Sequence, residues 1–381
     1  MEQFELIAPC HFGLESVMKR EVTDLGYEVT RVEDGKVAFA GDAQAIADAN
    51  LFFRTTERIL IRVGEFTATT FDELFEKTRA LPWERYIPKD GKFWVAKANS
   101  IKSRLFSPSD IQSIMKKAIV NRLGEAYGIS WFEETGSSYP IRVSILKDRV
   151  TVCLDTTGVS LHKRGYRRQT AKAPISETLA AALLMLTPWK GGRILVDPFC
   201  GSGTFPIEAA MMACHMAPGM KRTFLAEEWK NLIPAACWKN AREEAEDLVD
   251  RSVKTDIQGY DIDGEVLEAA RGNAERAGVT GLIHLQKRPV SELSHSGSYG
   301  FIVTNPPYGE RLEEKEALPE LYRTLGRQFS LLDSWSLYLI TAFDGVENCI
   351  GRKAAKNRKI YNGMIRAYFY QYPGPRPPKR G

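Results

Sequence analysis

The chain of 381 residues has few of the residues that build disulfide scaffolds or metal centres. It holds six cysteines, none of them in a C-x-x-C pair, and five histidines that form no H-E-x-x-H pattern. This sparse, scattered usage excludes a disulfide framework and a structural zinc site, and it is typical of a reducing compartment. We therefore expect a cytoplasmic protein without a metal site.

Long apolar runs and a strong charge imbalance are also missing. No stretch reaches about 18 consecutive apolar residues, so no membrane span is expected. The opening "MEQFELIAPC" lacks a basic region followed by a long apolar run, which predicts no secretory signal. The chain is 44% apolar and 26% charged, as in ordinary globular proteins, and its length predicts two or three domains. The net charge of +4 is compatible with a polyanionic partner but does not indicate one.

Two small α+β units are predicted in the amino-terminal part. Residues 1–65 read as strand, helix, strand, strand, helix and strand, which is the order of ferredoxin-like modules. Residues 66–157 form a second unit, with a hairpin that turns at Lys147-Asp148. Its most clearly marked helix has Ser107 or Ser109 as N-cap and ends at Gly124.

Basic side chains gather around this helix. They are Lys97, Lys102, Arg104, Lys116, Lys117 and Arg122. Such a cluster is typical both of a solvated helix face and of a surface that contacts phosphates, and the pattern alone does not choose. Residues 158–174 contain "LHKRGYRRQTAKAP", which has no apolar periodicity and is interpreted as a basic linker whose charge also suits phosphate contact.

From residue 175 onward, apolar strands alternate with helices, which predicts a doubly wound parallel sheet. In "RILVDPFCGSGTF" a strand ends at Asp197, and a Gly-rich turn opens a helix. Pro206 stands where a dinucleotide fingerprint needs glycine, and no G-K-[S/T] of a P-loop follows. A carboxylate beside a helix N-terminus suits a ligand that has both an ammonium and a carboxylate. The methionine part of S-adenosylmethionine has both.

A second acid follows the next strand. "DIQGYDID" ends at Asp261, and an acid at the end of strand two can bind ribose hydroxyls. The alternative is a plain helix N-cap. Because 64 residues separate this acid from Asp197 (261 − 197), we expect "MAPGMKRTFLAEEWKNLIPAACWKN" to be an insertion near the sheet edge.

The stretch "FIVTNPPYG" contains the third motif. Two prolines remove the backbone donors after Asn305 and stiffen the chain. The side chain of Asn305 and the carbonyl of Pro306 can then accept hydrogen bonds from the NH₂ group of a flat ligand, while Tyr308 stacks on its ring. A strand-ending turn is the alternative, since N-P often marks one.

Taken together, "DPFCGSGT", "GYDID" and "NPPYG" resemble the class I S-adenosylmethionine-dependent amino-methyltransferases. The upstream "LHKRGYR" and "APISETLAAALL" resemble the THUMP-domain RNA guanine-N2 methyltransferases, whose bacterial members include the amino-terminal half of 23S rRNA methyltransferase L. The resemblance implies a Rossmann-like α/β methyltransferase domain (doubly wound, mostly parallel sheet) at 175–372, preceded by a ferredoxin-like α+β domain and a THUMP RNA-binding domain at 66–157. Residues 373–381 form a Pro-rich basic tail.

The resemblance also assigns candidate residues. The residues expected to bind S-adenosylmethionine are Asp197, Pro198, Cys200, Gly201, Ser202, Gly203, Thr204 and Asp261. The residues expected to position the acceptor amine are Asn305, Pro306, Pro307 and Tyr308. The residues expected to contact RNA are Lys97, Lys102, Arg104, Lys116, Lys117, Arg164, Arg167, Arg168, Lys353 and Arg358. The last two lie in "GRKAAKNRKIYNG", which either lines an RNA path or is a solvated loop.

The implied reaction is methylation of a guanosine N2 amine, with 23S rRNA as the first candidate substrate and tRNA as the alternative. A different class, an RNA-binding assembly factor with a non-catalytic domain, also remains open. The sequence departs from the general fold family at Pro289, where an acid that binds adenine usually stands. No adenine-binding side chain is therefore assigned.

Overall fold

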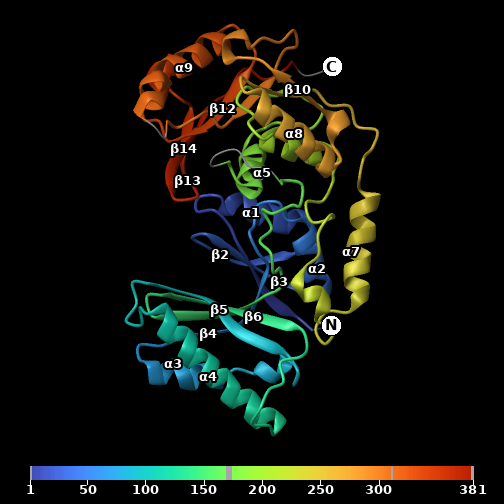
Figure 1. Ribbon diagram of the computed structural model, residues 1–381, viewed down its shortest axis with the longest axis vertical. Coiled ribbons are helices and arrows are strands. Elements are labelled where there is room, and N and C mark those ends of the chain that lie inside the picture. Colours follow the sequence, from blue (N-terminus) through green and yellow to red (C-terminus); the bar gives the residue numbers. More distant parts are fainter. Residues whose placement is uncertain (1, 169–173, 310–311, 379–381) are drawn as a thin grey trace.

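Two seven-stranded sheets form the frame of the molecule. The computed structural model describes residues 2–168, 174–309 and 312–378. The two sheets lie one above the other along the long axis in Figure 1, the amino-terminal sheet in blue to green and the carboxy-terminal sheet in yellow to red. None of the helices in these described ranges has the length and hydropathy of a membrane-spanning segment.

The first sheet begins with the predicted ferredoxin-like order, which the structure confirms. Its elements are β1 (Phe4–Pro9), α1 (Glu15–Asp24), β2 (Glu28–Glu33), β3 (Lys36–Gly41), α2 (Ala43–Phe52) and β4 (Leu60–Thr67). The strand order of the whole sheet is β2-β3-β1-β4-β7-β6-β5. Because β4 pairs with both β1 and β7, the two predicted units share one continuous sheet, and the boundary predicted between residues 65 and 66 lies inside β4.

The second unit completes this sheet and covers one of its faces with helices. Its elements are α3 (Phe71–Arg79), β5 (Lys92–Ile101), α4 (Pro108–Tyr127), β6 (Ser138–Leu146) and β7 (Arg149–Asp155). Ser107 caps α4, with its hydroxyl accepting from the amide of Asp110. The predicted end at Gly124 is wrong: α4 continues to Tyr127 and ends at the left-handed Gly128, because an interior glycine only weakens a helix that packing holds.

The second sheet has the order β10-β9-β8-β11-β12-β14-β13. Its elements are α5 (Glu177–Leu186), β8 (Leu195–Asp197), α6 (Thr204–Ala213), β9 (Ile257–Asp261), α8 (Gly264–Ala277), β10 (Ile283–Lys287), β11 (Phe301–Thr304), α9 (Leu312–Ser330), β12 (Ser336–Thr341), α10 (Val346–Ile350), β13 (Lys356–Asn362) and β14 (Ile365–Tyr372). The pairings from β10 to β12 are parallel, and β14 pairs antiparallel with both β12 and β13. This confirms the predicted doubly wound, mostly parallel sheet.

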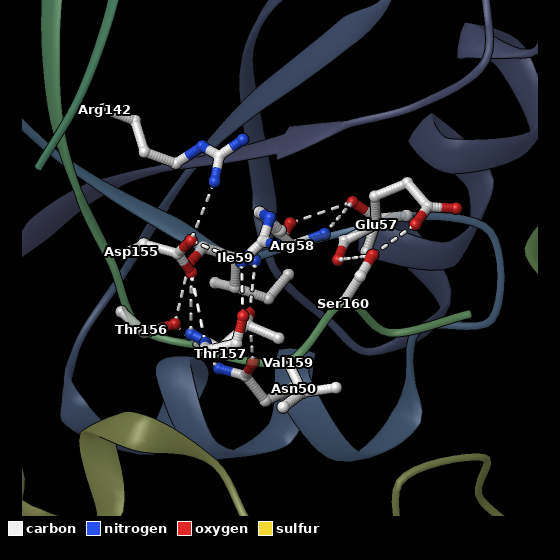
Figure 2. Close-up of polar contacts among 12 residues, drawn as sticks. Asn50, Glu57, Arg58, Ile59, Arg142, Asp155, Thr156, Thr157, Val159 and Ser160 are labelled. Atoms are coloured by element: carbon white, nitrogen blue, oxygen red, sulfur yellow. Dashed lines mark hydrogen bonds and ion pairs between the residues drawn. The ribbon is translucent and has the colours of Figure 1, made fainter. Parts of the chain in front are cut away.

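The described part of the predicted linker is packed rather than solvated. Figure 2 shows the polar contacts where the chain leaves β7. Asp155 accepts from Arg142 at 3.3 Å and also pairs with Arg58, while Thr157 Oγ1 donates to Asn50 at 2.7 Å. Farther on, Leu161 and Tyr166 are buried. The linker therefore leaves the first sheet in a fixed direction.

The insertion was predicted to lie near the edge of the second sheet, and this is wrong. It packs on the first sheet instead. It runs into α7 (Ala235–Asp247), which lies against α2. Trp229 stacks on Tyr139 of β6 with ring centroids 4.8 Å apart, and Asn231 accepts from the hydroxyl of Tyr139 at 2.9 Å. The buried aromatic side chains of this segment therefore join the core of the amino-terminal units.

Candidate active site

The three predicted motifs meet at one edge of the second sheet. β8 lies between β9 and β11, and all three strands are parallel. Asp197 is therefore aligned with Gly259, two positions before Asp261, and β11 ends beside β8 just before Asn305. In an open α/β sheet this carboxyl edge is where ligands bind.

Asp197 is buried at the centre of this edge. Its Oδ1 atom accepts from the hydroxyl of Thr304 at 2.6 Å and from the amide of Phe199 at 3.1 Å. Burial, together with the nearby charge of Asp261, raises the pKa of the carboxyl to about 7. Within the described ranges this carboxyl has no ion-pair partner, so the site is prepared for a cation that the protein itself does not supply.

Asp261 fixes the Gly-rich loop from the side of β9. Its Oδ2 atom accepts from the amide of Gly201 at 2.9 Å, and its Oδ1 atom accepts from the amide of Asp263 at 3.0 Å. Burial raises the pKa of this carboxyl. The N-cap of α8 is Asp263, which accepts from the amide of Glu265 at 2.8 Å. The plain N-cap alternative for Asp261 is therefore wrong, and each of its oxygens keeps a further lone pair for a ligand.

Hydrogen bonds from β9 and α8 fix the backbone of the Gly-rich loop. The amide of Cys200 donates to the carbonyl of Tyr260 at 2.9 Å, and Asn273 on α8 donates to the carbonyl of Ser202 at 3.0 Å. Gly203, with φ +84°, is the N-cap of α6, and a Cβ there would stand 3.1 Å from that of Ala270. The position thus needs glycine both for its conformation and for the close approach of α8.

Two arginines predicted to contact RNA are structural supports instead. The side chain of Arg164 is 1% exposed; it pairs with buried Glu208 at 3.5 Å and donates to the carbonyl of Leu161 at 2.7 Å. It cannot reach a phosphate, so that prediction is wrong.

Arg167 supports the Gly-rich loop. Its side chain is 11% exposed and lies 3.4 Å from Glu177, while its Nη2 atom donates to Thr204 Oγ1 at 2.6 Å. Thr204 opens α6, so Arg167 contacts the loop from the linker side. This geometry corrects its predicted role as an RNA contact.

The N-P-P-Y motif is also pre-ordered. The hydroxyl of Tyr308 donates to Asn305 Oδ1 at 2.6 Å, and Asn362 on β13 lies 3.5 Å from that hydroxyl. Burial raises the pKa of Tyr308 to about 12, so the phenol stays protonated at neutral pH. The carbonyl of Pro307 accepts from Tyr322 at 3.3 Å. Asn305 is half-buried and Pro306 is buried. The motif therefore forms one wall of the site at the carboxyl edge of the sheet.

Comparisons with known proteins agree with this architecture. Residues 164–371 match the family described as "RMKL-like, methyltransferase domain". Residues 5–60 match the "RlmL ferredoxin-like domain", and residues 68–155 match the "THUMP domain". The chain belongs to the RMKL-like methyltransferase family.

Relatives of this methyltransferase extend over its whole length. A protein of Bacillus subtilis (strain 168), named "Putative RNA methyltransferase YpsC", is 47% identical over 374 residues, which are 98% of this chain and 96% of the relative. The structure described as "a predicted N6-adenine-specific DNA methylase from Listeria monocytogenes str. 4b F2365" is 48% identical with a TM-score of 0.93, covering 98% and 97% of the two chains. "SMU.472, a putative methyltransferase complexed with SAH" is 42% identical with a TM-score of 0.94, covering 99% and 100%.

The remaining basic candidates of the methyltransferase differ in accessibility. The exposed ones are Lys97, Lys102, Arg104, Lys117, Arg168 and Lys353. Lys116 is half-buried, pairs with Glu134 at 3.0 Å and lies 3.6 Å from the centre of the Phe93 ring. Arg358 is half-buried and donates to the carbonyl of Gly13. These two are already engaged within the protein.

Three residues of the site were not predicted. Thr304 bonds Asp197, Asn273 bonds the loop, and Asn362 contacts Tyr308. Thr304 left a signal, because it is a polar residue at the end of an otherwise apolar strand. The other two left none, since their partners are far away in sequence. No group of three or more metal-ligating side chains occurs among the described residues.

Proposed function

We propose that this protein transfers a methyl group from S-adenosylmethionine to the exocyclic N2 amine of a guanosine in RNA. The hydrogen bond from Thr304 to Asp197, at 2.6 Å, carries the proposal. It joins the strand end that leads into N-P-P-Y to the buried acid of the Gly-rich motif, so a cofactor site and an acceptor site share one edge. The first candidate substrate is 23S rRNA, tRNA is the alternative, and the reaction takes place in the cytoplasm.

The residues of the Gly-rich edge fit S-adenosylmethionine. A ligand ammonium would give the buried carboxyl of Asp197 its missing charged partner. The hydroxyl of Ser202, buried without a hydrogen-bond partner among the residues that the structure describes, suits a further polar ligand group. We assign the methionine end to Asp197, Pro198 and the loop Cys200–Thr204, and the ribose to Asp261. When bound, the cofactor supplies an electrophilic methyl group.

The N-P-P-Y wall is assigned to the acceptor. Asn305 Oδ1 and the carbonyl of Pro306 accept hydrogen bonds from the target amine, the rigid Pro307 keeps the backbone in place, and Tyr308 offers its ring to the base. Acceptors fixed at the attacked nitrogen stabilise the positive charge that develops on it. A guanine reaches this wall only when it is unstacked, so the target nucleotide is flipped out of its helix.

The amino-terminal units are assigned to the grip on the RNA. The exposed basic side chains of the second unit, Lys97, Lys102, Arg104 and Lys117, suit phosphate contacts on a structured RNA, whose A-form helix is recognised by shape and backbone. The shared first sheet and the packed linker hold these units in a fixed position relative to the catalytic edge. We therefore expect the enzyme to select a guanosine at a set place in a folded RNA.

Mass spectrometry of nucleosides tests the function. A deletion strain should lack part of its N2-methylguanosine in rRNA or in tRNA, and purified protein with S-adenosylmethionine should restore it. Comparing the two RNA pools separates the two substrates. Unchanged N2-methylguanosine in both pools would refute the proposal. If calorimetry detects no binding of S-adenosylmethionine and the purified protein restores no nucleoside, the chain is an assembly factor instead.

A DNA adenine-N6 methylase is the second candidate, because one relative carries that description. Enzymes of that kind share an N-P-P-Y motif, but they do not require the THUMP domain that this chain has at 68–155. The same strains decide the question: loss of N6-methyladenine from DNA, with RNA unchanged, would favour the DNA enzyme.

A further inference from the structure

The hairpin of β13 and β14 has one face that combines aromatic rings and cations. The register pairs Tyr361 with Arg366 and Lys359 with Tyr368. Directly opposed residues, and residues two apart on one strand, share a face of a sheet. These four side chains therefore form a single surface, which we call the hairpin face. Lys359 and Arg366 are exposed, and Tyr361 is 40% exposed.

Cations and rings lie next to one another on the hairpin face. The ammonium of Lys359 is 5.4 Å from the centre of the Tyr361 ring, and the guanidinium of Arg366 is 6.0 Å from that of Tyr368. Residues 351–372 include six basic residues and no acidic one. The surface is thus strongly suited to an anionic partner that also has flat apolar groups.

The opposite face of the hairpin is not available. Ile360, Ala367 and Phe369 on that face are buried in the core of the second sheet. Arg358, also on that face, donates to the carbonyl of Gly13 just before α1. The hairpin is therefore anchored on the ferredoxin-like unit by one face and presents only the other to a ligand.

The tip of the hairpin lies beside the proposed acceptor site. Pairing between β12 and β14 ends at Thr341 and Tyr368, so the hairpin tip extends past the carboxyl edge of the sheet. At this tip Asn362, which follows Tyr361 and is on the opposite face, lies 3.5 Å from the hydroxyl of Tyr308, so the hairpin face is reached from the acceptor site around the tip. In Figure 1 the tip reaches from the second sheet toward α1, between the two halves of the molecule.

We propose that the hairpin face binds the single-stranded RNA next to the flipped guanosine. A neighbouring base stacks on Tyr361, and the phosphates on either side contact Lys359 and Arg366. Flipping one nucleotide leaves its neighbours without a stacking partner, and an aromatic surface with interleaved cations supplies one to any base. The inference rests on the proposed function and adds a contact surface to it.

Fluorescence anisotropy tests the surface without the cofactor. The probe is a labelled single-stranded RNA of mixed sequence, about 12 nucleotides long, within the span that such surfaces bind. Tyr361→Ala should weaken binding by about 5- to 100-fold, whereas Tyr361→Phe should bind like the parent, because stacking needs only the ring. Replacing both Lys359 and Arg366 by alanine should lower the slope of log affinity against log salt by about 1.4.

The matched control removes one exposed charge elsewhere. Lys239 on α7 is 73% exposed, and Lys239→Ala should leave both affinity and salt slope unchanged. Parental affinity in Tyr361→Ala and in the double variant, with parental melting temperatures, would overturn the inference. So would a loss for Lys239→Ala as large as that for the double variant, since the effect would then be general charge.

Methyl transfer to total RNA from the deletion strain separates the inference from the proposed function. If the parent binds the probe through the hairpin face but methylates no RNA, the inference stands and the function fails. If the variants bind the probe and methylate with a parental KM for RNA, the function stands and the inference fails.

Discussion

Tyr308 holds Asn305 through a hydrogen bond of 2.6 Å from its hydroxyl to the side-chain oxygen. Both residues belong to the N-P-P-Y turn, and the bond fixes which atom of the amide points to the donor. The bond spans three residues, so the turn organises itself before any ligand arrives. The same oxygen has a second lone pair for the target amine. A structural bond and a catalytic contact are therefore compatible at one atom.

Asn305→Ala should reduce the methyl-transfer rate by about 10²- to 10³-fold while S-adenosylmethionine and RNA bind nearly as in the parent. The reason is the loss of one preorganised acceptor at the nitrogen where charge develops. Asn305→Asp should retain partial activity, since a carboxylate also accepts from an amine. Single-turnover kinetics and thermal melts check both variants. A variant that melts earlier but methylates at the parental rate would show that N-P-P-Y is only a turn.

Tyr308→Phe should slow the chemical step by about 2- to 10-fold, in line with the worth of one neutral hydrogen bond. The ring remains, so stacking on the base is kept, but Asn305 loses the donor that orients it. Tyr308→Ala should cost more, because the stacking surface is lost as well. Single-turnover rates with saturating RNA measure the difference. Equal rates for the parent and Tyr308→Phe would show that the hydroxyl does not orient Asn305.

The meeting of Asp197, Asp261 and Asn305 was predictable because the rule behind it is simple. Each residue follows an apolar strand, and the carboxyl ends of parallel strands lie at one edge. The ferredoxin-like order and the mostly parallel sheet were likewise predictable from alternating strand and helix patterns.

The buried positions of Arg164 and Arg167 were not predictable. Both lie in a basic segment whose composition is typical of a solvated linker. In the structure, however, Arg164 pairs with buried Glu208 and Arg167 pairs with buried Glu177. The insertion shows the same limit: Trp229 packs on Tyr139, 90 residues earlier (229 − 139), and no local pattern announces a partner so far away.

Arg167 and Arg168 are neighbours with opposite expected roles. Arg167→Ala should weaken S-adenosylmethionine binding several-fold, because Thr204 loses a charged hydrogen bond worth roughly 1.5–3 kcal/mol, while RNA affinity stays near the parental value. Arg168→Ala, at an exposed position, should reduce RNA affinity and its salt slope and leave the cofactor affinity alone. Calorimetry for the cofactor and filter binding for RNA measure the pair. Identical profiles for the two variants would contradict this division.

Trp229→Ala should destabilise the amino-terminal sheet together with the catalytic domain. Removing a fully buried tryptophan costs about 3–5 kcal/mol, and its stack on Tyr139 ties the insertion to β6. Denaturant unfolding followed by fluorescence should show one transition, shifted to lower denaturant. Lys230→Ala, at the exposed neighbouring position, is the matched control and should change little. Two separate transitions in the parent protein would contradict a shared core.

For the same reason, a fragment that starts near residue 174 should expose the insertion's apolar side chains. We expect such a fragment to aggregate or to bind S-adenosylmethionine weakly, and light scattering with calorimetry checks this. A monodisperse fragment with parental cofactor affinity would show that the insertion is stable without its partners.

The pKa of Asp197 makes the stability of the ligand-free protein depend on pH. Burial raises this pKa to about 7, well above the value of about 3.9 in an unfolded chain. Between these two values the folded protein keeps a proton that the unfolded chain has lost, so the stabilisation is complete below about pH 4 and is lost as the pH rises through about 7. The melting temperature should therefore fall between about pH 4 and about pH 7 and level off above that, and it should fall by less in Asp197→Asn, which cannot ionise.

Cofactor affinity should change in the opposite direction over part of the same window. A ligand ammonium prefers the ionised carboxylate, so the affinity for S-adenosylmethionine should rise several-fold from about pH 6 to about pH 7.5, with release of a proton on binding. Asp197→Asn should bind weakly and with a flat pH profile. Calorimetry in two buffers of different ionisation enthalpy counts the released proton. A parental affinity that does not change with pH, or an Asp197→Asn variant that binds like the parent, would remove Asp197 from the cofactor site.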